Sequence, residues 1–335
     1  SISCTSSSSS SSTTSTDNTT TTGLFVTVGW EGTILTSSDG ISWTSRTSGI
    51  SKLLNGVTYG NNTFVTVGNS GTILTSPDGT SWTKRTSVTS KSLVGVTYGN
   101  GLFVTVGLSG TILTSSDGIS WTSRTSGISK SLREVTYGNG LFVTVGLSGT
   151  ILTSSDGNSW TERTSGISKS LREVTYGNGL FVTVGLSGTI LTSLDGTSWT
   201  ERTSGTSDHL WEVTYGNGLF VTVGQSGTVL TSSDGTTWTS RTSGTTEDLS
   251  GGVTYGNSIF VTVDYRGTIL TSSDGTTWTV RITGTWWNLN EVTYGNGLFV
   301  TVGNSGIIYT SPDGNSWTTR TTGTSNHLVG VTYSQ

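Results

Sequence analysis

The sequence predicts an all-β protein, an eight-bladed β-propeller of four-stranded antiparallel blades, and two observations lead to that prediction. A phrase of about 39 residues recurs from residue 24 to the end of the chain, and a period of roughly 40 is typical of propeller blades. The composition, rich in Thr, Ser and Val with 48 Gly and only 2 Pro, favours many short strands joined by tight turns. No window has the apolar period of a long helix. The aspartate of a recurring Ser-x-Asp-Gly step marks the copies: Asp39, Asp78, Asp117, Asp156, Asp195, Asp234, Asp274 and Asp313.

Each copy divides into four short strands. In the fourth copy we expect strands at Val135–Tyr137, Phe142–Val145 and Thr150–Thr153, and a fourth strand that begins at Trp160. The Gly-Asn-Gly turn Gly138–Gly140 suits the positive-φ positions of a two-residue hairpin. The second strand is apolar almost throughout, as expected when neighbouring blades cover both faces of the sheet.

The two ends of the array are offset in a way that predicts a closed ring. The array begins with a second-strand sequence, Leu24–Val28, and finishes with a first-strand sequence, Val331–Tyr333. Pairing of these two segments would complete an eighth blade and leave no unpaired strand at either end. We therefore expect one propeller domain over residues 23–335.

Residues 1–22 differ in composition, since they are almost entirely Ser and Thr after Cys4. Such a tract cannot bury apolar surface, so we interpret it as a flexible tail or tether. Cys4 is the only cysteine, which excludes an intramolecular disulfide. The segment Ser1–Cys4 resembles the end of a bacterial lipoprotein signal, which would make Cys4 a lipidation site and place the ring outside the cell or at its surface. The alternative is a stray cysteine in a flexible tail.

Charge and hydropathy exclude several classes of partner. The net charge is −4, with no basic stripe for nucleic acid and no polybasic segment for an anionic membrane surface. No apolar run approaches the roughly 18 residues of a membrane-spanning helix. We therefore expect no nucleic-acid partner and no transmembrane segment.

The recurring step has a longer consensus, Ser-x-Asp-Gly-x-Ser/Thr-Trp, as in Ser115–Trp121 and Ser311–Trp317. This motif resembles the Asp-box, also called the bacterial neuraminidase repeat, and the resemblance extends to all eight copies. Asp-boxes occur in sialidases, other glycosidases, photosystem II assembly factors and sortilin-type receptors. The resemblance implies a propeller with the box between the third and fourth strands, and it implies no single activity.

The repeats argue against a catalytic site. All eight aspartates share one sequence context, whereas catalysis needs one residue made different from its copies. Sialidases carry an Arg-Ile-Pro stretch, which this chain lacks. His209 and His327 share one repeat position three copies apart, with no further His or Cys to complete a metal set. We expect no catalytic residue, metal or cofactor.

One arginine per copy occupies a rim position, where we expect it to stack and bond to a neighbouring turn: Arg46, Arg85, Arg124, Arg163, Arg202, Arg241, Arg281 and Arg320.

Positions that differ between copies are candidates for recognition. The first-to-second and third-to-fourth turns share one face of a propeller and change little here, whereas the second-to-third turns and the links between copies share the other face and vary widely. Later copies present aromatic side chains beside carboxylates on that face, a combination that suits sugar rings or an apolar peptide. Drift on a solvent-exposed face is the alternative. The candidate ligand-binding residues are Trp30, His209, Trp211, Glu212, Tyr265, Trp286, Trp287, Glu291 and His327.

The sequence therefore favours a non-catalytic binding or adhesion module, secreted or at the cell surface, that recognises a glycan or a partner protein on the variable face. One alternative is a structural or assembly protein whose copies associate into a layer or filament. The other alternative is a sialidase-like glycosidase, which the missing sequence features disfavour.

Overall fold

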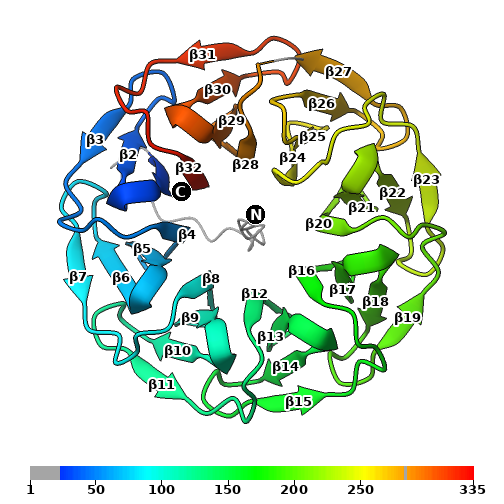
Figure 1. The fold of residues 1–335 in the computed structure, drawn as a ribbon, viewed down its shortest axis with the longest axis horizontal. Helices are drawn as coiled ribbons and strands as arrows, with labels where there is room; N and C mark the ends of the chain where they lie inside the picture. The colour runs from blue at the N-terminus through cyan, green and yellow to red at the C-terminus, as the bar shows by residue number, and fades with distance from the viewer. Residues whose placement is uncertain (1–22, 283–284) are drawn as a thin grey trace, which may run out of the picture.

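The computed structural model describes residues 23–282 and 285–335, which form eight four-stranded antiparallel sheets arranged in a ring (Figure 1). The first strand of each blade lies nearest the centre and the fourth lies at the rim. The helical elements of the described residues are short 3-10 turns, and none is long and apolar enough to span a bilayer. The predicted eight-bladed, all-β propeller is confirmed.

We number the blades in chain order from the one that contains the N-terminal strand. Blade 1 contains β32 (Leu328–Tyr333), β1 (Phe25–Gly29), β2 (Ile34–Ser37) and β3 (Thr44–Arg46), and blade 2 contains β4 (Leu54–Gly60), β5 (Thr63–Gly68), β6 (Thr72–Ser76) and β7 (Thr83–Arg85). Blade 3 contains β8 (Leu93–Gly99), β9 (Leu102–Gly107), β10 (Ile112–Ser115) and β11 (Thr122–Arg124), and blade 4 contains β12 (Leu132–Gly138), β13 (Leu141–Gly146), β14 (Ile151–Ser154) and β15 (Thr161–Arg163). Blade 5 contains β16 (Leu171–Gly177), β17 (Leu180–Gly185), β18 (Ile190–Ser193) and β19 (Thr200–Arg202), and blade 6 contains β20 (Leu210–Gly216), β21 (Leu219–Gly224), β22 (Val229–Ser232) and β23 (Thr239–Arg241). Blade 7 contains β24 (Val253–Gly256), β25 (Ile259–Val263), β26 (Ile269–Ser272) and β27 (Thr279–Ile282), and blade 8 contains β28 (Leu289–Gly295), β29 (Leu298–Gly303), β30 (Ile308–Ser311) and β31 (Thr318–Arg320).

A 3-10 turn follows the second strand in every blade except blade 7. These turns are η1 (Trp30–Gly32), η2 (Asn69–Gly71), η3 (Leu108–Gly110), η4 (Leu147–Gly149), η5 (Leu186–Gly188), η6 (Gln225–Gly227) and η7 (Asn304–Gly306).

The predicted strands are in place, although their boundaries differ from the expectation by one to three residues. β12 begins at Leu132 rather than Val135, because a bulge between Leu132 and Glu134 lets the pairing with β13 continue to Gly146. The fourth strand begins one residue after Trp160, whose indole Nε1–H donates to the carbonyl of the turn glycine and so belongs to the turn.

The C-terminal strand closes the ring, as the offset of the two ends predicted. β32 pairs with β1 in antiparallel register, with Phe25 opposite Tyr333 and Thr27 opposite Val331. In Figure 1 the red end of the chain lies beside the blue beginning of the same blade. The Ser334 N–H donates to the Leu24 carbonyl at 2.9 Å, which extends the pairing beyond the strands.

The hydrophobic core is divided among the interfaces between neighbouring blades. At one interface Val65, Val67 and Ile73 of blade 2 pack against Phe103 and Leu113 of blade 3, and all five side chains are fully buried. Complete burial of such a side chain stabilises the fold by roughly 1.5–3 kcal/mol. Because every blade contributes to the interface on each of its two sides, each blade depends on two neighbours.

The Ser-x-Asp-Gly turn is held by its own side chains. In blade 3, Asp117 Oδ1 accepts the N–H groups of Ser120 (3.0 Å) and Ile119 (2.8 Å) and the hydroxyl of Ser115 (3.1 Å), while the Trp121 indole donates to the turn glycine. The two backbone N–H bonds lower the pKa of the carboxyl below its usual value. The same pattern recurs in all eight blades.

The rim arginines share one bond, although not the one expected. In blade 4 the Arg163 Nε donates to the Thr153 hydroxyl at 2.8 Å, which joins β15 to β14 rather than to a neighbouring turn. The equivalent bond forms in every blade. Each arginine thereby fastens the short outermost strand of its blade.

Candidate functional site

The links between blades and the second-to-third turns lie together on one face of the ring, which we call the variable face. In blade 3 the Leu108 N–H donates to the Ser92 carbonyl of the incoming link at 3.0 Å. The next residue, Ser109, donates its N–H to the Ser131 hydroxyl of the outgoing link at 3.3 Å. Each turn therefore contacts both links that flank it, which is the arrangement that the sequence predicted.

Large exposed aromatic side chains gather on one part of the variable face. Trp286 is 75% exposed, Tyr265 56%, Trp287 49% and Trp30 48%. They come from the second-to-third turns of blades 7 and 1 and from the link between blades 7 and 8. We call these four residues the aromatic patch, and all four were predicted as ligand-binding residues.

The backbone at Trp286 is strained. Its φ is +64°, in the left-handed region that a bulky residue rarely adopts. The equivalent positions of the other links carry Ser or Thr, and none of those residues has a positive φ: Ser51, Ser90, Ser129, Ser168, Ser207, Thr246 and Ser325. Strained backbone of this kind persists where the surrounding structure holds it, and it is enriched at functional sites.

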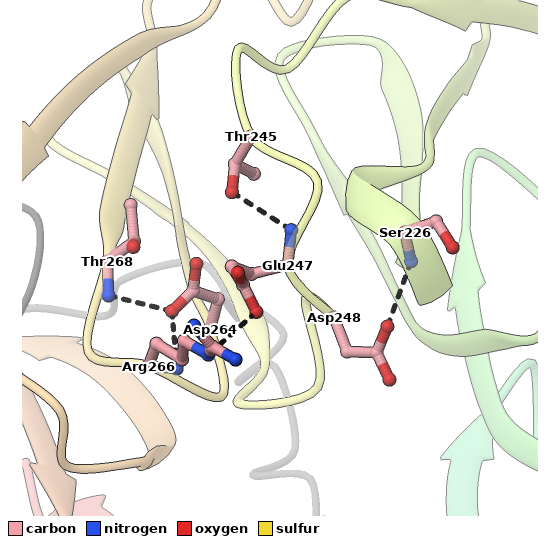
Figure 2. A network of polar contacts seen from close by, with 7 residues as sticks. All are labelled: Ser226, Thr245, Glu247, Asp248, Asp264, Arg266 and Thr268. Carbon is pink, nitrogen blue, oxygen red and sulfur yellow. Dashed lines mark hydrogen bonds and ion pairs between the residues drawn. The ribbon is translucent and has the colours of Figure 1, made fainter.

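An ion pair supports the Trp286 side chain from the neighbouring turn. The Arg266 guanidinium lies 5.7 Å from the Trp286 ring centroid, within cation–π range. Arg266 Nε is 3.2 Å from Glu247 Oε2, and the Glu247 N–H donates to the Thr245 hydroxyl at 3.1 Å (Figure 2). These contacts connect the link between blades 6 and 7, through the blade 7 turn, to the exposed Trp286 side chain.

Asp264 shapes the turn that carries Tyr265 and Arg266. It stands where the other blades have glycine, and its Oδ1 accepts the N–H groups of Thr268 (2.7 Å) and Arg266 (2.8 Å) (Figure 2). The side chain is fully buried, and this burial raises the pKa of the carboxyl. Sequence analysis missed Asp264 and Arg266, although the departure from glycine at one repeat position is a signal that could have found them.

The two predicted histidines are used in contacts between blades. His209 Nδ1 accepts the Ser187 N–H at 3.0 Å, and His327 Nδ1 accepts the Ser305 N–H at 2.9 Å, in each case from the turn of the preceding blade. Other links place serine or aspartate at this position to make the same bond. The His327 ring also packs edge-on at 4.7 Å from the Trp30 ring, at the border of the aromatic patch.

The remaining predicted residues lie apart from the aromatic patch. Trp211 is half-buried at the inner end of its link, packed on His209 and under the Arg172 guanidinium, which lies 5.0 Å from its ring. Glu212 and Glu291 are only 3% exposed and line the centre of the ring rather than the variable face. The structure therefore divides the predicted set among the aromatic patch, the Trp211 contact and a central cavity.

The central cavity has a volume of about 680 Å³ and is lined by the innermost strands. One threonine from every blade lines it, and every blade except blade 5 also contributes a tyrosine, such as Tyr137 of β12. Four buried glutamates complete its lining: Glu134, Glu173, Glu212 and Glu291. Among the described residues, no three His, Cys, Asp or Glu side chains are grouped as a metal ion would require.

Comparisons with known proteins show the fold. No protein-family model matches the chain, and no curated protein matches its sequence. Among solved structures, it is similar to YCF48 from Cyanidioschyzon merolae, with a TM-score of 0.60 and 16% identity over 77% of this chain and 94% of that one. It is also similar to YCF48 bound to D1 peptide, with a TM-score of 0.55 and 19% identity over 73% of this chain and 86% of that one. The computationally designed Ika8 protein gives a TM-score of 0.69 with 13% identity over 88% of this chain and 92% of that one.

Proposed function

We propose that this chain is a non-catalytic binding module that holds a segment of a partner protein on the variable face, with Trp286 as the main anchor. One observation carries the proposal: Trp286 projects into solvent from strained backbone, with a guanidinium braced against its ring. The strain and the cation–π contact occur together at Trp286, which distinguishes it from Val88, whose backbone is also strained.

The composition of the patch supports protein recognition. Residues that dominate binding at protein interfaces are enriched in Trp, Tyr and Arg, which are the residue types that meet here. Trp287 follows the anchor in the same link, and Tyr265 precedes Arg266 in the turn that contacts it, so further aromatic side chains are exposed in the same turn and link. Large exposed aromatic groups in one area are unusual for a protein that binds nothing.

The fold and the charges of the links favour a protein segment over a sugar as the ligand of the variable face. YCF48, which has a similar ring fold, was solved with a D1 peptide bound. The aromatic patch is also flanked by opposite charges at a single repeat position of the links. That position carries lysine in the first four links, then two acidic residues, then Trp287 and finally Asn326: Lys52, Lys91, Lys130, Lys169, Asp208 and Glu247. Such a pattern distinguishes the ends of a bound segment, because charges at an interface fix register and orientation.

The proposal also includes a location outside the cell and membership of the Asp-box propeller family. The segment Ser1–Cys4 and the Ser/Thr-rich tract that follows it support attachment outside the cell through Cys4. The eight Ser-x-Asp-Gly turns support membership of the Asp-box propellers, where binding modules and enzymes share one architecture.

Selection of binders tests the proposal. A random peptide display library and a glycan array are each probed with the wild-type chain, and the binders are measured again with Trp286→Ser, which restores the residue of six other links. The matched control is Ile119→Thr, which removes an apolar side chain of 54% exposure from the opposite face. We expect peptide binders whose affinity falls about tenfold or more with Trp286→Ser, as for a central aromatic anchor, and is unchanged with Ile119→Thr.

Four results would contradict the proposal. The first two are selected peptides that bind Trp286→Ser as tightly as wild type, and peptides that lose affinity equally with Trp286→Ser and Ile119→Thr. Binding confined to the glycan array would replace the protein partner with a sugar. Large assemblies of the purified chain in sedimentation, together with no binder of either kind, would favour a structural role.

A further inference from the structure

One position near the start of the innermost strands is used differently by different blades. The residue after the first leucine of the strand is asparagine in blades 2 and 8 and arginine in blades 4 and 5: Asn55, Asn290, Arg133 and Arg172. Asn55 Nδ2 donates to the Leu93 carbonyl of the next blade at 2.8 Å. Asn290 Nδ2 likewise donates to the Leu328 carbonyl of the next blade at 2.7 Å. Asparagine at this position therefore joins two blades.

The two arginines do not replace that bond. Arg133 Nε and Arg172 Nε are both buried without a hydrogen-bond partner. Within residues 23–282 and 285–335, neither guanidinium donates a hydrogen bond or forms an ion pair. Both side chains are partly buried, and the Nη groups at their tips reach solvent. Since each guanidinium has five N–H donors and none of them serves the fold, the packing of the ring does not explain why two blades carry arginine here.

Arg133 and Arg172 are neighbours on the variable face. β12 and β16 lie side by side in the ring, and each arginine is the second residue of its strand, at the end that receives the link (Figure 1). Burial lowers the pKa of Arg172, and the Arg133 charge lowers it further, so the two guanidinium groups are close enough to repel each other. An anion between two such cations would relieve that repulsion.

Trp211 orients the Arg172 guanidinium without using its donors. The guanidinium carbon lies over the Trp211 ring, 5.0 Å from its centroid. The same ring packs edge-on against His209 at 5.3 Å, and His209 Nδ1 accepts the Ser187 N–H at 3.0 Å. The tryptophan is thus held by the link and the turn of blade 5. A guanidinium that stacks through its face keeps its N–H groups, which lie along its edge, available to a ligand.

The surroundings favour a carboxylate over a more highly charged anion. Lys130 and Lys169, each three residues before one of the arginines, are exposed and add positive charge at the same links. The Glu212 charge raises the pKa of Arg172, so negative charge is also present nearby. A phosphate group carries about two negative charges at pH 7 and is repelled more strongly by Glu212 than a carboxylate is. Planar guanidinium groups donate in pairs to the two oxygens of a carboxylate.

We propose that Arg133 and Arg172 bind a carboxylate group, either an acidic side chain of a protein or a small free acid, at the variable-face end of blades 4 and 5. The site lies in other blades than Trp286 and does not depend on it.

A nuclear magnetic resonance titration of the isotope-labelled full chain tests the proposal. The reporter is the Trp211 indole N–H, which has no acceptor among the described residues and is identified by its loss in Trp211→Phe. The probes are butanedioate, the peptide Gly-Gly-Asp-Gly-Gly with both ends blocked, and sodium phosphate. We expect the reporter to shift to saturation with a carboxylate probe.

Four variants measure the contribution of the arginines. Arg133→Asn and Arg172→Asn introduce the residue of blades 2 and 8, and Arg172→Lys keeps the charge but loses the planar fork. The control is Lys84→Gln, which removes an exposed cation from the rim strand of blade 2. We expect each arginine variant to weaken carboxylate binding about tenfold or more, since hydrogen bonds to charged groups commonly contribute that much, and Lys84→Gln to leave it unchanged. Urea midpoints check that every variant is folded.

The outcomes separate the sources of the carboxylate and can overturn the proposal. Binding of butanedioate alone would identify a small free acid, whereas comparable binding of the peptide would identify an acidic side chain. Absence of carboxylate binding, binding of phosphate alone, undiminished binding in folded arginine variants, or an equal loss in Lys84→Gln would each overturn it. Trp286→Ser should bind the carboxylate probes as wild type does, so either proposal can fail while the other stands.

Discussion

Blades 4 and 7 have the same core packing and differ on the variable face. The ring centroids of Phe142 and Trp160 in blade 4 are 6.4 Å apart, and those of Phe260 and Trp278 in blade 7 are also 6.4 Å apart. The differences begin at the variable face. β12 has seven residues and β24 only four, and the 3-10 turn of blade 4 is replaced in blade 7 by a turn built on Asp264.

The comparison separates two kinds of sequence constraint. Packing between blades fixes the middle of each strand, because any change there alters two interfaces. The links and second-to-third turns contact mainly each other and solvent, so a blade can rebuild them without loss of its core. Blade 7 uses that freedom to place Arg266 beside Trp286 and to expose Tyr265 on the same turn.

The largest expected effect tests whether the two cores are equivalent. Phe142→Ala and Phe260→Ala should each lower the free energy of unfolding by about 3–5 kcal/mol, because both rings are fully buried between blades. Urea denaturation of the two variants measures this directly. A difference between them greater than about 1 kcal/mol would mean that the altered face of blade 7 reaches into its core.

A smaller effect separates strain that serves binding from strain that does not. Val88 also has a positive φ, +56°, where most other links have glycine, and it is 68% exposed. Val88→Gly and Trp286→Gly should each raise the free energy of unfolding by about 1 kcal/mol, because glycine adopts this conformation without a steric penalty. Denaturant midpoints measure that gain, and the selected peptides measure binding. Only Trp286→Gly should weaken binding; a loss with Val88→Gly would show that the two strained links are functionally alike.

The smallest effects per residue lie in the pH dependence of stability, where the turns and the cavity have opposite signs. Backbone N–H bonds from Ser159 and Asn158 lower the pKa of Asp156, so its stabilising contribution is complete above the unfolded value of about 4 and is lost as the pH falls through the lower folded value. Burial raises the pKa of Glu291, so its ionisation opposes folding as the pH rises above the unfolded value of about 4.3.

Thermal unfolding between pH 3 and pH 8 checks both signs. Stability should rise as the pH falls from 8 toward about 5 and decline below about 4. Glu291→Gly should flatten the upper part of the profile, and Asp156→Asn should flatten the lower part by a small amount. An upper limb that is unchanged in Glu291→Gly would contradict the effect of burial on the pKa of Glu291.

Much of the variable face could be predicted, and the errors have one physical source. Trp30, Tyr265, Trp286 and Trp287 were expected on this face and are exposed there, because each stands at a position that differs between copies. Glu212 and Glu291 were grouped with them because they are close in sequence. A bulge at the start of the innermost strands of blades 6 and 8 separates them, for example by leaving Trp211 at the link while Glu212 enters the cavity.

The sequence by itself determined the number of blades, the four strands of each, the closure by the C-terminal segment and the face on which the copies diverge. Those features follow from the repeat, because each copy contains its own turn residues and apolar strand positions. Only the tertiary structure decided which divergent residues meet. Arg266 reaches Trp286 from the turn 20 residues earlier in the chain, because the blade folds that turn back against the link. Four glutamates from four blades share one cavity, because the ring brings together positions that are 39 residues or more apart in the chain.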